Sequence, residues 1–328
     1  MEFRLILLLL IFVGASSAQA LDVENPAVKS FIDSMVSDHS YDRDTLEDVL
    51  QQASIQESIL EAIDRPAERT KEWHEYRDIF ITDERVQAGA TFWHEHSDEL
   101  QRISEQTGVA VEILVGIIGV ETYFGRITGK YRVLDALATL AFEYPPRAAF
   151  FMSELEQFLL LVREEGMDAT DAIGSYAGAM GRPQFMPSSY RAYAVDSSDD
   201  GKRDIWSDWS DVIGSIANYF VRHGWRENAE IVAQAALSSQ WQGELPENTL
   251  RPEETVTSLS HQGVLFVTDL PGDQKSQLLT LEGDDGEEHW VGFHNFFVIT
   301  RYNRSVMYAL AVHQLGQEIA LEVKRGET

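Results

Sequence analysis

The sequence predicts an α+β protein in which helices predominate and a small β-rich section comes late in the chain. Apolar residues recur at three- and four-residue spacing through much of the chain between residues 25 and 228, as in amphipathic helices. Between residues 245 and 303 short β-prone runs replace that spacing, and a helical pattern returns over 305–322. Helices, then strands, then a closing helix favour a fold in which the strands form a section of their own.

Residues 1–20 are predicted to be a signal peptide. A charged start (MEFR) precedes an apolar stretch, and small residues end at Ala20, where cleavage is expected. A retained membrane anchor is the weaker alternative, because the apolar stretch is well short of the ~20 residues that a span needs. The chain has no cysteine, which excludes both disulfides and a lipidated cysteine after the signal. We therefore expect an exported, soluble protein with no membrane anchor in its mature form.

Composition narrows the choice of partners. With 44% hydrophobic residues the chain is globular rather than disordered, and its length allows one large or two modest domains. The formal net charge is −28. Such a surface repels nucleic acid and anionic membranes, so neither is expected as a partner.

A helical subdomain is predicted over residues 21–90. Asp42 or Asp44 caps its second helix, which runs through Val49. The apolar positions that mark the first and third helices are Val28, Phe31, Ile32, Met35, Ile55, Ile59 and Ile63.

Further elements follow from the same patterns. The turn Asp284-Asp285-Gly286 between two β-prone runs predicts a hairpin. The closing helix leaves 323–328 as a tail. Helical patterns cover 134–142, 148–163 and 212–223, and β-prone runs cover 264–267, 278–281, 289–293 and 296–300.

Glu121 is the first candidate for chemistry. It ends the apolar run 109–120 and is followed at once by Thr-Tyr-Phe-Gly. Apolar surroundings disfavour the charged form of a carboxyl group, and a glycosidase needs such a protonated acid to assist a poor leaving group. The alternative is an ordinary surface glutamate where a buried helix emerges.

A second informative stretch, 174–190, is dense in glycine and alanine, which allow close approach of backbone to a ligand or a neighbouring helix. Ser175 and Gln184 then have the groups to hydrogen-bond a polar substrate. Ser175 lacks the Gly-x-Ser-x-Gly frame of a serine hydrolase. A tightly packed loop without catalytic duty is an equally good interpretation of this stretch alone.

An acidic loop beginning at Asp196 resembles the front of an EF-hand. Its twelfth position is Ser207 rather than the usual bidentate glutamate, so Asp211 or Asp208 is needed to close a calcium site. An acidic turn that binds no ion is the alternative. Positions one, three, five, six and seven correspond to Asp196, Ser198, Asp200, Gly201 and Lys202, the last through its backbone carbonyl.

Taken together, five ordered segments closely resemble the lytic transglycosylase B family, murein-cleaving enzymes with a lysozyme-like core. The resemblance extends from about Val28 to Leu315 and implies a catalytic region over 21–320, with the lysozyme-like core over 91–228. The segments are 119–125 (GVETYFG), 134–140 (LDALATL), 178–190 (GAMGRPQFMPSSY), 213–220 (IGSIANYF) and 299–303 (ITRYN).

The resemblance also implies roles for individual residues. Glu121 matches the family's catalytic acid, and Asp211 matches the last calcium ligand of members that bind the ion. The loop 144–147 reads Tyr-Pro-Pro-Arg where the family often has two arginines, so only Arg147 is carried over. Glycan-binding roles are implied for Ser175, Gln184, Tyr219, Tyr302, Tyr308 and Tyr76.

The implied reaction cleaves the β-1,4 bond between N-acetylmuramic acid and N-acetylglucosamine in the periplasm and forms a 1,6-anhydro end. No cofactor is required for that chemistry, and the implied partner is the glycan strand of peptidoglycan. Two alternatives remain open at the level of sequence. One is a hydrolase of the same bond, and the other is a non-catalytic glycan-binding protein that kept the cleft.

Overall fold

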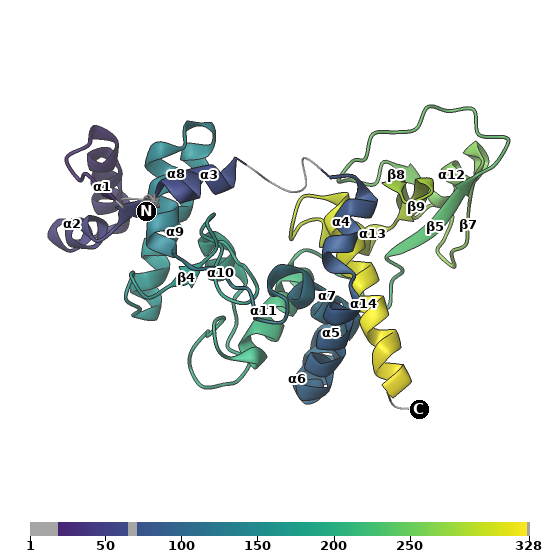
Figure 1. Ribbon diagram of the computed structural model, residues 1–328, viewed down its shortest axis with the longest axis horizontal. Helices are drawn as coiled ribbons and strands as arrows, with labels where there is room; N and C mark the ends of the chain where they lie inside the picture. Colours follow the sequence, from purple (N-terminus) through teal and green to yellow (C-terminus); the bar gives the residue numbers. More distant parts are fainter. Residues whose placement is uncertain (1–18, 65–70, 327–328) are drawn as a thin grey trace, which may run out of the picture.

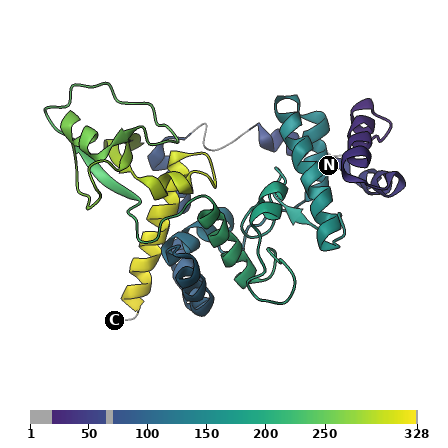
Figure 2. The ribbon, with the colours of Figure 1, turned by 180° about the vertical axis from the view of Figure 1, so that it is seen from behind.

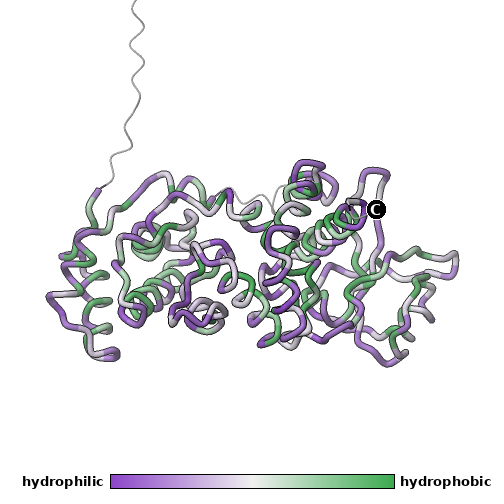
Figure 3. Tube along the Cα trace, turned by 90° about the horizontal axis from the view of Figure 1, so that it is seen from below, coloured by the Kyte–Doolittle hydropathy of each residue, from purple (hydrophilic) through white to green (hydrophobic). Residues whose placement is uncertain are grey.

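The computed structural model describes residues 19–64 and 71–326. Its fold is predominantly helical with a small sheet, as the sequence predicts, and the N-terminal helices and the sheet lie at opposite ends of the molecule (Figure 1). Most of the predicted signal peptide and residues 327–328 fall outside the described residues. Figure 3 shows hydrophobic and hydrophilic positions interspersed along the chain at both ends.

One end of the molecule is a helical lobe. Asp135 is almost fully buried there and accepts hydrogen bonds from the Ser54 amide at 2.8 Å and from Arg132 Nη2 at 2.7 Å, which ties two distant parts of the chain together. Asp42 caps the second helix by accepting from the Thr45 amide. The lobe contains α1 (Pro26–His39), α2 (Arg43–Gln51), α3 (Glu57–Ile63), α8 (Val133–Glu143), the short 3-10 helix Pro145–Arg147, α9 (Ala148–Glu165) and strands β1 (Gln19–Ala20) and β2 (Ser54–Ile55).

The middle of the molecule is built around two helices, α7 (Val111–Thr122) and α14 (Val306–Gly326), which cross closely (Figure 2). A Cβ added at Gly116 would lie 2.4 Å from the carbonyl oxygen of Val312, so only glycine permits this approach. Around the pair lie α4 (Trp73–Phe80), α5 (Asp83–Glu95), α6 (Ser97–Thr107) and α11 (Trp209–Arg222). Between this part and the helical lobe, α10 (Pro187–Tyr193) packs on α9 and α11, and the paired strands β3 (Tyr131–Arg132) and β4 (Ile173–Gly174) adjoin α8.

The far end carries a five-stranded antiparallel sheet in the order β6-β8-β9-β5-β7. Asp284 and Asp285 form the predicted two-residue turn, because Gly283 pairs with Gly286. A separate small core of Val256, Leu259, Val264, Leu278, Val291 and Phe293 lies between the sheet and α12. The elements are β5 (Val232–Leu237), β6 (Glu254–Thr255), α12 (Val256–Gln262), β7 (Val264–Phe266), β8 (Lys275–Gly283) and β9 (Gly286–Gly292).

Two details differ from the sequence-based expectation. The run 296–300 was predicted as a strand but lies in and just after helix α13 (His294–Ile299). Every residue of the run is buried, and four consecutive apolar residues have no periodicity that separates a strand from a helix. The sheet also begins before residue 245, with β5 at Val232. The sequence did not predict this strand, because its small residues (VAQAAL) have a weak preference for strands.

The packing divides the chain differently from the predicted segment boundaries. Helices α4 and α5, placed by sequence in the N-terminal subdomain, pack on α14. Helices α8 and α9, placed in the core, join the N-terminal helices instead. The closing helix continues to Gly326 rather than ending at 322. Among the helices described, none is by itself long and apolar enough to cross a membrane; α6 and α7 together would be, but they are bent by 118°.

Candidate active site

Glu121 lies one residue before the end of α7, a helix whose other positions after Glu112 are buried. Its side chain is half-buried, and Oε1 accepts a hydrogen bond of 2.5 Å from the hydroxyl of Tyr308. Immediately after the helix, Tyr123 and Phe124 adopt left-handed backbone conformations with φ of 50° and 57°. Such conformations cost energy in residues with a side chain and are concentrated at functional sites. The strained turn fixes where the glutamate emerges.

Tyr308 and Tyr302 form a wall beside this carboxyl group. Their rings are stacked, with centroids 6.5 Å apart and planes at 12°. Burial, with the negative charge of Glu121, raises the pKa of both hydroxyls well above 10, so both stay protonated and act as hydrogen-bond donors. Tyr302 donates to the carbonyl oxygen of Pro183 at 2.7 Å. Tyr76 on α4 is buried and close enough to Tyr308 to contribute to its raised pKa.

The loop 174–190 reaches the site at Pro183, whose carbonyl oxygen accepts the hydrogen bond from Tyr302. The next residue, Gln184, is left-handed, with φ of 54°, and its side-chain nitrogen donates to the carbonyl oxygens of Thr128 at 3.1 Å and Gly181 at 2.9 Å. Both amide hydrogens are therefore used inside the protein, while no donor among the described residues contacts its Oε1. Ser175 is used locally, because its Oγ accepts from the amides of Ala177 and Ala179.

The remaining two predicted contacts lie in different settings. Tyr219 on α11 donates to the carbonyl oxygen of Arg301 at 2.5 Å, and its ring lies 4.8 Å from that of Tyr302. Burial raises its pKa, so it too is a donor that holds the tyrosine wall. Arg147 is exposed on the helical lobe, with its guanidinium 4.4 Å from the Phe150 ring. No described contact joins Arg147 to Glu121 or the tyrosines.

Sequence reasoning missed two supporting residues. Thr122 Oγ1 donates to the carbonyl oxygen of Arg182 at 3.1 Å and accepts from the Gly125 amide. The Arg182 guanidinium lies 3.9 Å from the Trp209 ring centre and donates to the carbonyl oxygen of Ser207. Both residues stand inside segments that carry the family resemblance, which was the available signal. Their contacts link the end of α7 to the acidic loop.

The acidic loop has some, but not all, of the features of a calcium site. Gly201 has φ of +86°, as the sixth position of such a loop requires. Asp196 accepts from the Asp200 and Gly201 amides, and Asp211, fully buried, accepts from three backbone amides. The carboxylate, hydroxyl and carbonyl oxygens of the loop are ligands of the kind that calcium binds. Within the described part of the chain, however, no three His, Cys, Asp or Glu side chains converge closely enough to hold a metal.

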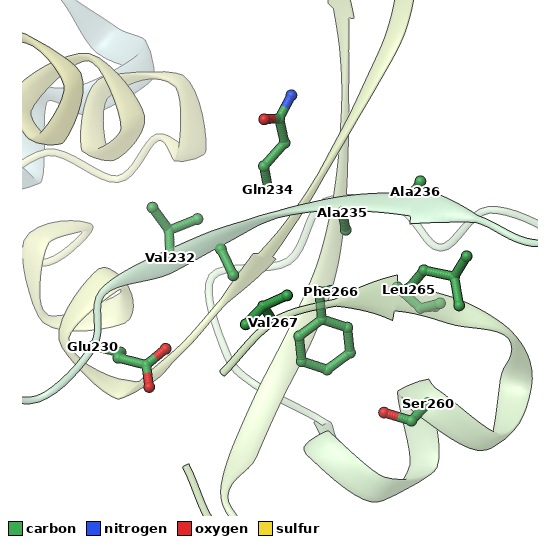
Figure 4. Close-up of a pocket in the computed structure, with 11 residues that line it drawn as sticks. Glu230, Val232, Gln234, Ala235, Ala236, Ser260, Leu265, Phe266 and Val267 are labelled. Atoms are coloured by element: carbon green, nitrogen blue, oxygen red, sulfur yellow. The ribbon is translucent and has the colours of Figure 1, made fainter. Parts of the chain in front are cut away.

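A cavity of about 880 Å³ lies elsewhere, beside β5 and β7 (Figure 4). Its lining is mostly aliphatic, with Val232, Leu265 and Val267 among the side chains. Its one carboxylate, Glu230, accepts a hydrogen bond from the Asp269 amide. None of its lining residues comes from α7, α14 or the loop 174–190, so it is separate from the cluster around Glu121.

The cluster defines a class of enzyme. The site combines a half-buried carboxyl group at the end of a buried helix, a tyrosine hydrogen-bonded to it, and a loop in which Gln184 Oε1 accepts no hydrogen bond from the described residues. These are groups suited to acid-assisted cleavage of glycosidic bonds. The family model described as "Transglycosylase SLT domain" matches residues 24–317, and the chain belongs to this family.

Similarity to individual proteins of this family narrows the class further. It is 46% identical over 306 residues to membrane-bound lytic murein transglycosylase B of Escherichia coli K12, a match covering 90% of this chain and 83% of that protein. Soluble lytic transglycosylase SltB1 of Pseudomonas aeruginosa is 49% identical, with a TM-score of 0.86 over 92% of this chain and all of that one. The Escherichia coli transglycosylase Slt35, solved in complex with calcium, is 44% identical, with a TM-score of 0.82 over 93% and 96% of the two chains. The protein is thus a lytic murein transglycosylase, a lyase that acts on peptidoglycan, and the predicted family and fold class are confirmed.

Proposed function

We propose that Glu121 acts first as the acid and then as the base of this reaction. Its carboxyl proton passes to the oxygen of the β-1,4 bond between N-acetylmuramic acid and N-acetylglucosamine, and the bond from that oxygen to the anomeric carbon breaks. The substrate's own N-acetyl oxygen stabilises the developing positive charge. The C6 hydroxyl then attacks the anomeric carbon and returns its proton to Glu121, so a 1,6-anhydro end forms without water.

The hydrogen bond from Tyr308 to Glu121 carries this proposal. A tyrosine held protonated by burial donates to Oε1 of Glu121, where it stabilises the negative charge once the proton has left and fixes the orientation of the carboxyl group. Tyr302, Tyr219 and Tyr76 maintain the wall that holds Tyr308, and the glycan is proposed to bind beside this wall. Gln184 accepts a hydrogen bond from the substrate through Oε1. Ser175 and Arg147 are proposed to contact the strand further from the cleaved bond.

The place of action and the calcium loop are also proposals. Removal of the leader after Ala20 would release the enzyme into the periplasm without a lipid anchor, since the chain has no cysteine. The calcium complex of the relative Slt35 supports an ion in the acidic loop. The ligands would be Asp196, Ser198, Asp200, the carbonyl oxygen of Lys202, and Asp211. The ion would be structural, because it supplies none of the groups that the proton transfers need.

Mass spectrometry of the fragments released from purified sacculi tests the reaction. Transglycosylase products carry an anhydro end and are one water lighter than the products of hydrolysis. Glu121→Gln is the matched control, since it keeps the shape of the side chain but has no proton to donate. Hydrated products would establish the hydrolase alternative, and no release by the wild type would establish a binding protein.

A further inference from the structure

Two adjoining cavities lie on the side of α14 that faces away from Glu121. They share Arg77, Trp290 and Gln314, and their volumes are about 440 and 430 Å³. Together they form what we call the α4–α14 groove, between α4, α14 and the β8–β9 hairpin, which lie side by side in Figures 1 and 2. Each cavity is within the size range of small-ligand sites.

Helix geometry separates this groove from the active site. At 3.6 residues per turn, His313, Gln314 and Gln317 lie roughly 140°, 240° and 180° around α14 from Tyr308. The Tyr308 side of the helix is the one that meets α7, through Val312 and Gly316. A ligand in the groove is therefore separated from Glu121 by the thickness of α14.

The walls of the groove are held rigidly. Glu288 accepts hydrogen bonds from the indole nitrogens of Trp73 at 3.2 Å and Trp290 at 3.4 Å, and it forms an ion pair with Arg77 at 3.4 Å. Arg77 also pairs with Asp284 in the hairpin turn. These contacts fix the half-buried Trp290 ring at the junction of the two cavities before any ligand arrives, which lowers the entropic cost of binding.

The lining of the groove matches an uncharged sugar. An indole face packs against the apolar face of a pyranose, and amide side chains offer both donors and acceptors to hydroxyl and acetamido groups. His313 adds a neutral imidazole, because burial lowers its pKa to about 4. The single cation, Arg77, is already paired, so the excess of carboxylates disfavours anionic ligands. The amides are Gln234, Gln314 and Gln317, and the carboxylates are Asp284, Asp285, Glu287, Glu288 and Glu318.

We propose that the α4–α14 groove is a second glycan-binding site, which takes N-acetylglucosamine units of a strand that is not being cleaved. This inference rests on the proposed function, because a murein-cleaving enzyme works on a meshwork of such strands. A site behind the active-site wall holds the enzyme on that meshwork between cleavage events. Its loss should weaken attachment to sacculi and leave cleavage of short soluble glycan unchanged.

Chitotriose, which carries only N-acetylglucosamine, is a suitable probe in the Glu121→Gln background. In protein labelled at the indole nitrogens, Trp290→Phe assigns the Trp290 signal by its disappearance. We expect that signal to shift saturably with chitotriose. The double variant Gln314→Ala/Gln317→Ala should weaken the titration at Trp290 about ten-fold, as the loss of two hydrogen bonds does. Gln101→Ala, an exposed helical glutamine on α6, is the matched control and should leave it unchanged.

With Glu121 restored, the double variant should bind sacculi several-fold more weakly and cleave short soluble glycan at the wild-type rate. The proposal is overturned if Trp290 does not respond to chitotriose, or if the double variant binds sacculi as Gln101→Ala does. Wild-type protein that shifts at Trp290 but yields no anhydro products would refute the proposed function and leave the groove standing.

Discussion

Glu121 and Asp211 are carboxyl groups at opposite kinds of helix end, and they have opposite surroundings. Glu121 stands at the C-terminal end of α7, where the helix dipole disfavours negative charge, and it is half-buried with a tyrosine hydroxyl as partner. Asp211 stands in the first turn of α11, fully buried, and accepts from the amides of Ser197, Ser198 and Asp204. The first setting suits a group that gives up and regains a proton, and the second suits a permanent acceptor that organises a loop. Burial alone therefore does not identify a catalytic acid.

The largest effect on activity is expected from substitution of Glu121, at the C-terminal end of α7. Glu121→Gln removes the proton that the mechanism transfers, and general acid–base catalysis contributes about 10²–10⁴-fold. Turnover of sacculi should fall by that factor while the melting temperature stays the same or rises. Turnover near the wild-type level would remove Glu121 from the mechanism, and the difference between its surroundings and those of Asp211 would then have no catalytic meaning.

Asp211→Ala should show the opposite pattern. Three backbone amides lose their acceptor, and leaving buried donors unsatisfied costs about 1–3 kcal/mol each before the loop relaxes. Urea unfolding in the presence of a chelator should show a loss of about 3 kcal/mol. The folded enzyme, assayed well below its melting temperature, should keep its turnover. A folded but inactive variant would mean that the acidic loop and the end of α7 at Glu121 are coupled, through the contacts of Arg182 with Thr122 and Ser207.

Acid titration of stability should show a smaller effect, from a partly buried histidine on the far side of α14 from Glu121. Burial lowers the pKa of His313, five residues beyond Tyr308 on α14, from 6.5 to about 4. The unfolded chain then takes up a proton at higher pH than the folded protein, so this stability is present above pH 6.5 and is lost as pH falls toward 4. The slope is at most about 1.4 kcal/mol per pH unit. His313→Gln should flatten the profile in that window, and the exposed His94→Gln should not; equal profiles for the two variants would contradict the assignment.

The smallest effect is expected from calcium. An ion that binds only the folded protein at ten times its dissociation constant stabilises it by about 1.4 kcal/mol. Calorimetry of chelator-stripped protein should show the melting temperature rise on addition of calcium. Asp200→Ala should abolish that rise. Asp199→Asn, outside the proposed ligand set and suited to the left-handed backbone at this position (φ 60°), should keep it. If stripped wild type shows no shift, the loop is an acidic turn held by Asp211 alone.

Individual residues show which structural features could be predicted from the sequence. Asp42 was one of two predicted caps and is the one used, and the Asp284-Asp285 turn forms as predicted, because both signals depend on neighbours within a few residues. The helix over 294–299 was not predicted from the sequence, because its consecutive apolar residues show no hydrophobic periodicity. Thr122 and Arg182 had no predicted role, since their contact joins residues far apart in the chain.

The sequence by itself determined the fold class, the family and the residue proposed as the acid, because apolar spacing and ordered motifs are local properties of the chain. Only the tertiary structure decided what Glu121 touches. Its partner Tyr308 arrives from the last helix, at a distance set by the close crossing of α7 and α14 at Gly116. The packing of distant helices likewise turned Tyr219 and Tyr302 toward backbone carbonyls and created the α4–α14 groove. Such contacts depend on the summed packing of side chains far apart in sequence, which no local pattern encodes.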